Sequence, residues 1–307
     1  MIAKLFDQIN LRSLLAACFS ILIFALPFII WLNRPAALEW YEQSWLYFLP
    51  ALFTAIFFGE ITNRQRSFEG HYHIPVLFTA FLLCFLPLFT ELSALLTFPF
   101  LLIFFLRASG LLTRQEIRFL VFDLGLMIGF GSLFWLDLLL LAPLSIILLI
   151  AVGRFQLRLL VILFLGIAAA LYTAIAGLAI FGLNLWPGFI EALTQWSFHP
   201  NFNLAQPWFS QLIPLSLVPL VVLLYPSIAK RSNNLQRQNL IFWLVILIVS
   251  VAGGLFLDKL FWWALILPYP LSILLGLSIK QSSNRWFRNG FYLMLLGGVL
   301  LSLVFFL

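Results

Sequence analysis

Apolar runs separated by short polar breaks follow one another along almost the whole chain. Many of these runs have about 17–25 residues, the length of a helix that crosses the hydrocarbon core of a bilayer. They are apolar on every face rather than alternating, which indicates spanning helices and not the strands of a lipid-exposed barrel. The breaks predict eleven spans, at about 13–32, 44–59, 74–90, 92–106, 118–134, 136–152, 158–182, 211–226, 239–257, 260–279 and 290–307.

The ends of the runs and the small residues within them refine this prediction. The run 13–32 lacks a small-residue cleavage site, so we interpret it as a retained span. The breaks at Glu91 and Asp137 are tight and predict helical hairpins. Small residues that allow close helix packing include Gly125, Gly129, Gly131, Gly166, Gly253 and Gly254. Four prolines are expected to kink or interrupt their helices, namely Pro214, Pro219, Pro268 and Pro270.

Composition excludes a soluble protein, because 64% of the residues are hydrophobic and only 9% are charged. A soluble domain carries roughly 25% charged residues. The net charge of +6 would suggest nucleic acid in a soluble chain, but orientation explains it more simply. If the N-terminus is cytoplasmic, fifteen of the 17 basic residues fall in cytoplasmic segments and only Arg34 and Lys259 fall outside, as the positive-inside rule requires.

The predicted architecture is therefore an all-α polytopic transmembrane bundle in the cytoplasmic membrane. Its N-terminus is cytoplasmic, its C-terminus is external, and no nucleic-acid partner is expected. The chain forms one integral membrane domain over 1–307, with a core of about seven spans at 1–182, an external aromatic loop at 183–210 and four spans at 211–307.

Acidic residues gather in the predicted external loops. The stretch "NRPAALEWYEQSW" holds Glu39 and Glu42, which share one face if the loop is helical. Glu91 and Asp137 stand at the next two external turns. Carboxylates of this kind serve as general bases, metal ligands or recognition groups, and they also serve as ordinary polar caps at a water interface. The sequence leaves both interpretations open.

The longest predicted external loop, 183–210, combines turn residues with aromatic side chains. Trp186 and Trp196 are typical of the headgroup zone of a bilayer. His199 lies in the same loop, and "FIEALTQWSF" can form a short interfacial helix.

Three further features contain side chains that can carry a proton or bind a metal ion. Asp123 is the intramembrane acid, and either proton or cation coupling or a pairing with Arg114, Arg118 or Arg158 accounts for it. The stretch "EGHYH" at 69–73 is interpreted as a turn at the interface, since its two histidines lack the spacing of a metal site. The two cysteines lie in apolar runs, and we predict neither a disulfide nor a metal site.

The order of these parts resembles the membrane-embedded C-type glycosyltransferases over roughly residues 1–210. "FDLGLMIGFGSLFWLDLLLLAPLSIILLIAV" is similar to the paired core helices of that family, and the loop 183–210 takes the place of its lid. The first acid is Glu where that family usually has Asp, and the first external loop is short. The stretch "RASGLLTRQEIRFLVFDLGLMIGFGSLFWLDLLLL" also looks like an uncharacterised inner-membrane family of Bacteroidota.

This resemblance implies an enzyme that uses a polyprenyl-phosphate-linked sugar at the outer face of the membrane. Glu39 or Glu42 would be the catalytic base or the carboxylate that orients a metal ion, and Glu91 its helper. The implied substrate contacts are Arg34, Lys259, Asp137, Trp186, Trp196 and His199. The cofactor stays open, with a divalent cation as one candidate. The alternatives are a non-catalytic scaffold or subunit of an envelope or secretion assembly, with a membrane-protein partner, and a transporter.

Overall fold

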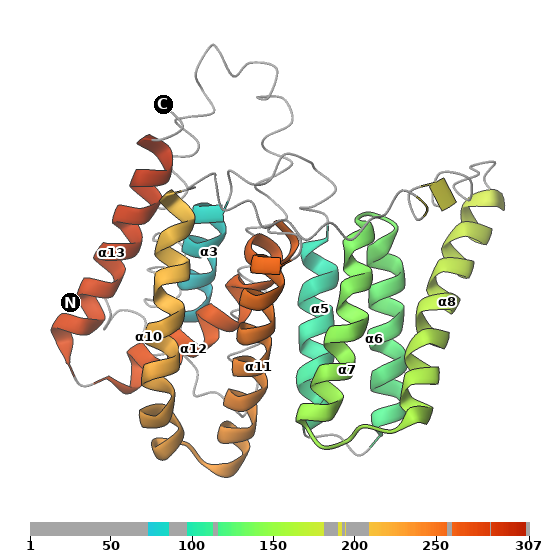
Figure 1. Ribbon diagram of the computed structural model, residues 1–307, viewed down its shortest axis with the longest axis horizontal. Helices are drawn as coiled ribbons and strands as arrows, with labels where there is room; N and C mark the ends of the chain where they lie inside the picture. The colour runs from blue at the N-terminus through green and yellow to red at the C-terminus, as the bar shows by residue number, and fades with distance from the viewer. Residues whose placement is uncertain are drawn as a thin grey trace, which may run out of the picture.

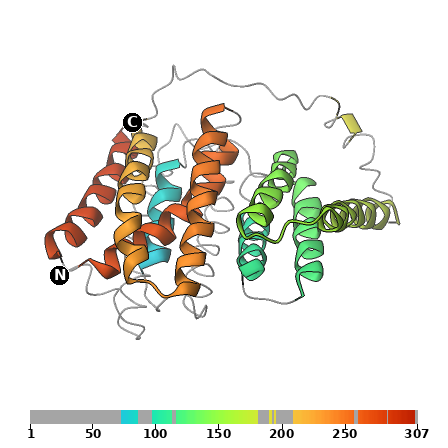
Figure 2. The ribbon, with the colours of Figure 1, turned by 60° about the horizontal axis from the view of Figure 1, so that its bottom comes forward.

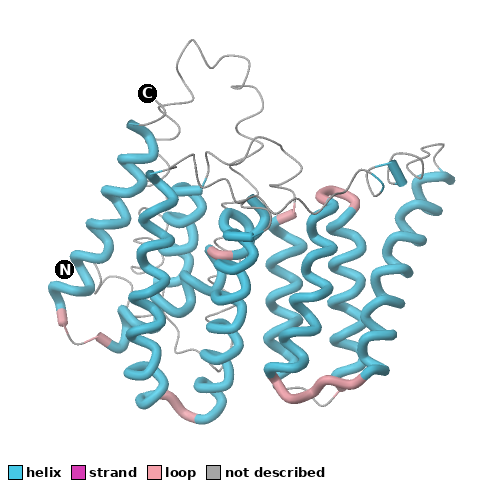
Figure 3. The backbone as a smooth tube through the Cα atoms, viewed as in Figure 1, coloured by secondary structure: helices cyan, strands magenta, loops and turns pink. Residues whose placement is uncertain are grey.

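The structure is a computed structural model, and it describes residues 73–85, 97–112, 116–180, 190–191, 194, 209–256, 260–282 and 284–304. Over these residues the fold is helical throughout and contains no strand (Figure 3). The predicted spans 13–32 and 44–59 lie outside the described residues.

The helices form two neighbouring groups (Figure 1). One group contains α5 (Phe98–Ser109), α6 (Ile117–Ser132), α7 (Leu141–Ala151) and α8 (Leu157–Ile180). The other contains α3 (His73–Phe85), α10 (Phe209–Arg231), α11 (Asn234–Phe256), α12 (Pro268–Gln281) and α13 (Arg285–Val304). Shorter elements are the 3₁₀ helices η4 (Gly110–Leu112) and η5 (Leu136–Leu140) and the π-helix η6 (Leu260–Ile266).

Three stretches of helix in the described part are long and apolar enough to cross a membrane. They are Leu157–Gly177, Gln236–Phe256 and Trp262–Gln281. Shorter apolar helices cover His73–Leu82, Phe98–Leu112, Leu136–Ala151 and Pro214–Lys230. The described part is therefore all-helical, as predicted, and three of its helices are long and apolar enough to cross a membrane.

Local capping explains where two of the hairpins turn. Gly153 adopts a φ of +70° after α7. There the amide of Arg154 donates to the carbonyl of Leu149 at 2.9 Å and that of Gly153 to Ile150 at 2.9 Å, which is the Schellman arrangement. Before α11, the side chains of Asn233 and Gln236 bond reciprocally to each other's amides at 2.8 and 3.1 Å, which forms a capping box. Both turns lie at the lower end of the bundle in Figure 1.

An aromatic cluster joins the two helix groups. Tyr269 of α12 is fully buried, and its ring lies 4.7 Å from that of Phe78 and 4.8 Å from that of Phe105, between ring centroids. Its hydroxyl donates to the carbonyl of Phe98 at 3.3 Å. Phe105 also contacts Trp243 of α11, at 5.7 Å between centroids. Helix α5 is thus held against α11 and α12 by rings that bury large apolar areas.

Glycines bring α6 and α8 into close contact, as the sequence predicted. A Cβ atom added to Gly125 would lie 3.0 Å from the Cα of Gly166, and one added to Gly129 would lie 2.6 Å from the Cβ of Ala170. Side chains larger than these would therefore force the two backbones apart. Gly253 and Gly254 of α11 have a different role, because they make room for the indole rings of Trp262 and Trp263.

The prolines of α10 do not interrupt that helix. Helix α10 is continuous although Pro214, Pro219 and Pro226 lie inside it, so of the predicted kink or interruption the interruption does not occur. Packed neighbours and local adjustment allow proline inside membrane helices. Near Pro268 the helix changes its type, because the π-helix η6 ends at Ile266 and α12 begins at Pro268 within one apolar helical stretch.

Candidate functional site

Basic residues lie at one end of the described bundle, the lower end in Figure 1. Each stands near the end of a helix that meets a lower turn, and together they are Arg107, Arg118, Arg154, Arg158, Lys230, Arg231, Arg237, Lys280, Arg285 and Arg288. Every described lysine and arginine belongs to this set, which we call the basic end. Charge is therefore strongly segregated along the helix axes.

Asp137 lies at the opposite end, where η5 follows α6. Its Oδ2 atom accepts a hydrogen bond from the indole Nε1 of Trp135 at 2.8 Å, and both side chains are partly buried. The bond fixes a carboxylate beside an aromatic ring at the rim of the bundle. A fixed carboxylate next to a ring is suited to contact a sugar hydroxyl, and it equally serves as the polar end of a membrane helix.

The other residues of the predicted external site lie outside the described residues. They are Arg34, Glu39, Glu42, Glu91, Trp186, Trp196, His199 and Lys259. Of the predicted set, the structure thus places only Asp137 and Asp123, and it does not bring these two together. Asp123 lies nine residues before the end of α6, so about 14 Å of helix separates it from the turn that leads to Asp137.

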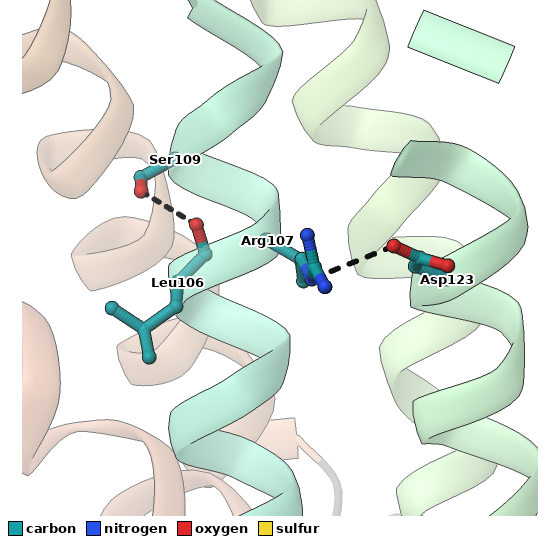
Figure 4. A network of polar contacts seen from close by, with 4 residues as sticks. All are labelled: Leu106, Arg107, Ser109 and Asp123. Carbon is teal, nitrogen blue, oxygen red and sulfur yellow. Dashed lines mark hydrogen bonds and ion pairs between the residues drawn. The ribbon is translucent and has the colours of Figure 1, made fainter. Parts of the chain in front are cut away.

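Asp123 forms an ion pair with Arg107 of the preceding helix, with 3.5 Å between Oδ2 and Nε (Figure 4). The side chains are 33% and 44% exposed, respectively, and both lie towards the basic end. The sequence named Arg114, Arg118 and Arg158 as partners; the structure shows Arg107 instead of Arg118 or Arg158, and Arg114 lies outside the described residues. The pairing supports the structural interpretation of this acid, because acidic side chains within membrane spans commonly pair with a basic side chain.

The last histidine of "EGHYH" has a role that the sequence did not predict. His73 begins α3 and is fully buried, so it is not part of an exposed interface turn. Its Nδ1 atom lies 2.5 Å from the hydroxyl of Tyr292 in α13. The pair therefore links two helices that are far apart in the sequence. Within the described ranges no group of three or more metal-ligating side chains occurs.

The sequence indicates the pairs Asp123–Arg107 and His73–Tyr292 only weakly. Arg107 stands near the end of one helix and Asp123 near the start of the next, so a hairpin register would have suggested them as partners. Nothing in the local sequence of His73 indicates Tyr292, because their contact depends on the packing of α3 against α13.

Comparison with known proteins gives no assignment. No protein-family model matches the chain, and no curated protein and no solved structure matches it significantly. No matching sequence or structure therefore supports the resemblance of layout to the C-type glycosyltransferases. The function must be argued from the residues of this chain.

Proposed function

We propose that the chain is an eleven-span protein of the cytoplasmic membrane, with a cytoplasmic N-terminus and an external C-terminus. The gathering of the described basic residues at one end of the bundle supports this topology, because lysine and arginine are enriched in cytoplasmic loops. Asp137 then belongs to the external end.

The activity we propose is transfer of a sugar from a polyprenyl phosphate at the external face. Asp137 is the observation that supports it: a carboxylate held by Trp135 at the end of the bundle where the predicted acids of the first two external loops would also lie. Glu39 or Glu42 would act as the base and Glu91 as its helper. Arg34 or Lys259 would contact the phosphate, and Asp137 would bind a sugar hydroxyl with Trp186, Trp196 and His199.

The chemistry needs few groups. In an inverting transfer, a carboxylate removes the proton from the acceptor hydroxyl as the hydroxyl oxygen forms the new glycosidic bond. The bond from the sugar to the lipid phosphate breaks, and the phosphate leaves with the electron pair. A basic side chain or a divalent cation would stabilise the charge on the leaving phosphate.

Replacing the predicted base tests this proposal. We expect Glu39→Gln or Glu42→Gln to abolish transfer of sugar from a polyprenyl-phosphate donor in membrane vesicles, since glutamine cannot accept the proton. Removal of a general base typically costs about 10²–10⁴-fold in rate. Glu116→Gln is the matched control, because Glu116 is exposed at the basic end and should leave transfer unchanged. Full activity in both single variants and in the double variant would contradict the proposal.

A second candidate function is a non-catalytic membrane scaffold or subunit. It is favoured by α8, which lies at the edge of the bundle in Figures 1 and 2 and exposes large apolar side chains. Tyr172 and Ile180 are 76% and 84% exposed, respectively. Such a face packs against lipid or against another membrane helix. This candidate predicts that every external acid tolerates substitution. The third alternative, a transporter, rests on Asp123, which the structure pairs with Arg107.

A further inference from the structure

Helices α6 and α8 run parallel in a constant register. Gly125 lies against Gly166, and one turn later Gly129 lies against Ala170. The same register carried back to the first turns places Arg118 level with Leu159, next to Arg158. Two arginines from separate helices are therefore expected side by side at the basic end.

These arginines are exposed, and little negative charge opposes them. Arg118 and Arg158 both have exposed side chains. Of the nearby described acids, Asp123 is paired with Arg107. Glu116 is exposed and lies outside the helix, as the N-cap residue of α6 two residues before Arg118.

Large apolar side chains stand beside each of the two arginines. Phe119 is 70% exposed next to Arg118, and Leu157 is 74% exposed next to Arg158. Phe155 in the preceding turn is 44% exposed. The apolar stretch Leu157–Gly177 begins at this level, so these side chains stand where the hydrocarbon core meets the headgroups.

We propose that the α6–α8 surface at the basic end binds the headgroup of an anionic phospholipid. Arg118 and Arg158 contact the phosphate, and Phe119 and Leu157 lie against the first carbons of the acyl chains. Guanidinium groups bind phosphate oxygens in a bidentate way, and apolar neighbours favour a lipid over a free anion. This surface lies at the end of the bundle opposite the predicted catalytic loops, so lipid binding here does not depend on the proposed glycosyl transfer.

Native mass spectrometry of the detergent-solubilised chain with added phosphatidylglycerol or phosphatidylcholine tests the proposal. We expect the wild type to retain phosphatidylglycerol in preference to phosphatidylcholine. The double variant Arg118→Gln, Arg158→Gln should bind phosphatidylglycerol about 30-fold more weakly, and each single variant about fivefold more weakly. The single variants keep the test decisive if the double variant does not fold.

The matched control is Lys230→Gln with Lys280→Gln, which removes the same charge from the basic ends of α10 and α12. We expect this control to retain phosphatidylglycerol as the wild type does. Unchanged binding in the arginine variants would overturn the proposal. So would an equal loss in the lysine control, because binding would then follow total charge rather than this surface.

Discussion

Gly166→Ala is expected to lower the melting temperature of the protein by about 4–8 °C. The added Cβ would lie 2.5 Å from the carbonyl oxygen of Phe122 and 3.0 Å from the Cα of Gly125. Both are backbone atoms, so the change can be accommodated only if α6 and α8 move apart. Overpacking costs ~1–3 kcal/mol, and the better helix propensity of alanine offsets at most about 1 kcal/mol. A net loss of ~2 kcal/mol corresponds to the stated shift.

Gly177→Ala is the matched control, because Gly177 belongs to the same helix and a Cβ there would meet nothing within 4 Å. Alanine should leave stability unchanged or raise it slightly. Cys84 provides the measurement, since its thiol is buried and becomes reactive only on unfolding. With Cys18 replaced by serine, heating in the presence of a fluorogenic maleimide reports the transition. Equal melting temperatures for the two alanine variants would show that α6 and α8 are not in close contact.

Gly254→Ala is expected to destabilise the protein at least as strongly, by ~3 kcal/mol. The new Cβ would overlap the indole ring of Trp263, which is only 6% exposed. Gly253 makes the same room for Trp262, so the two indoles of η6 lie against the two glycines of α11. A rigid ring in a packed site cannot move aside without opening the contact between α11 and η6, which places the cost at the upper end of overpacking.

A compensating substitution separates this contact from a general effect on α11. Trp263→Leu alone should also destabilise, because it leaves a cavity. In combination with Gly254→Ala the loss of stability should be smaller than the sum of the two single losses. Leucine removes the indole ring that the new Cβ would overlap, and the new Cβ fills part of the cavity that the indole leaves. Gly297→Ala in α13, where a Cβ would meet nothing within 4 Å, is the control. Additive losses in the double variant would mean that Gly254 and Trp263 do not touch.

Apolar runs and charge placement predicted the helices well. The runs at 118–134 and 158–182 correspond closely to α6 and α8, because breaks in hydropathy coincide with the turns. The glycines of these runs also indicated close helix packing correctly, because a residue without a Cβ atom lets two helix backbones approach each other. Both signals are local, which is why a single sequence contains them.

Features that depend on longer-range packing were missed. The run 260–279 was predicted as a span with a kink or break near Pro268, but the π-helical form of its first part, η6, was not predicted. Hydropathy cannot reveal that change, because both forms are apolar throughout. The partners of Asp123 and His73 come from other helices and follow from the packing of the bundle. The roles of Glu39, Glu42 and Glu91 stay a prediction, because these residues lie outside the described ranges.

The orientation of the bundle is the central claim, and site-directed thiol labelling of intact cells tests it most directly. In a chain with both native cysteines replaced, Phe134→Cys places a thiol in the exposed turn after α6, and Gln156→Cys places one in the exposed turn before α8. We predict that a membrane-impermeant maleimide labels position 134 in intact cells and position 156 only after the membrane is opened. Labelling of position 156 in intact cells, with position 134 protected, would contradict the account.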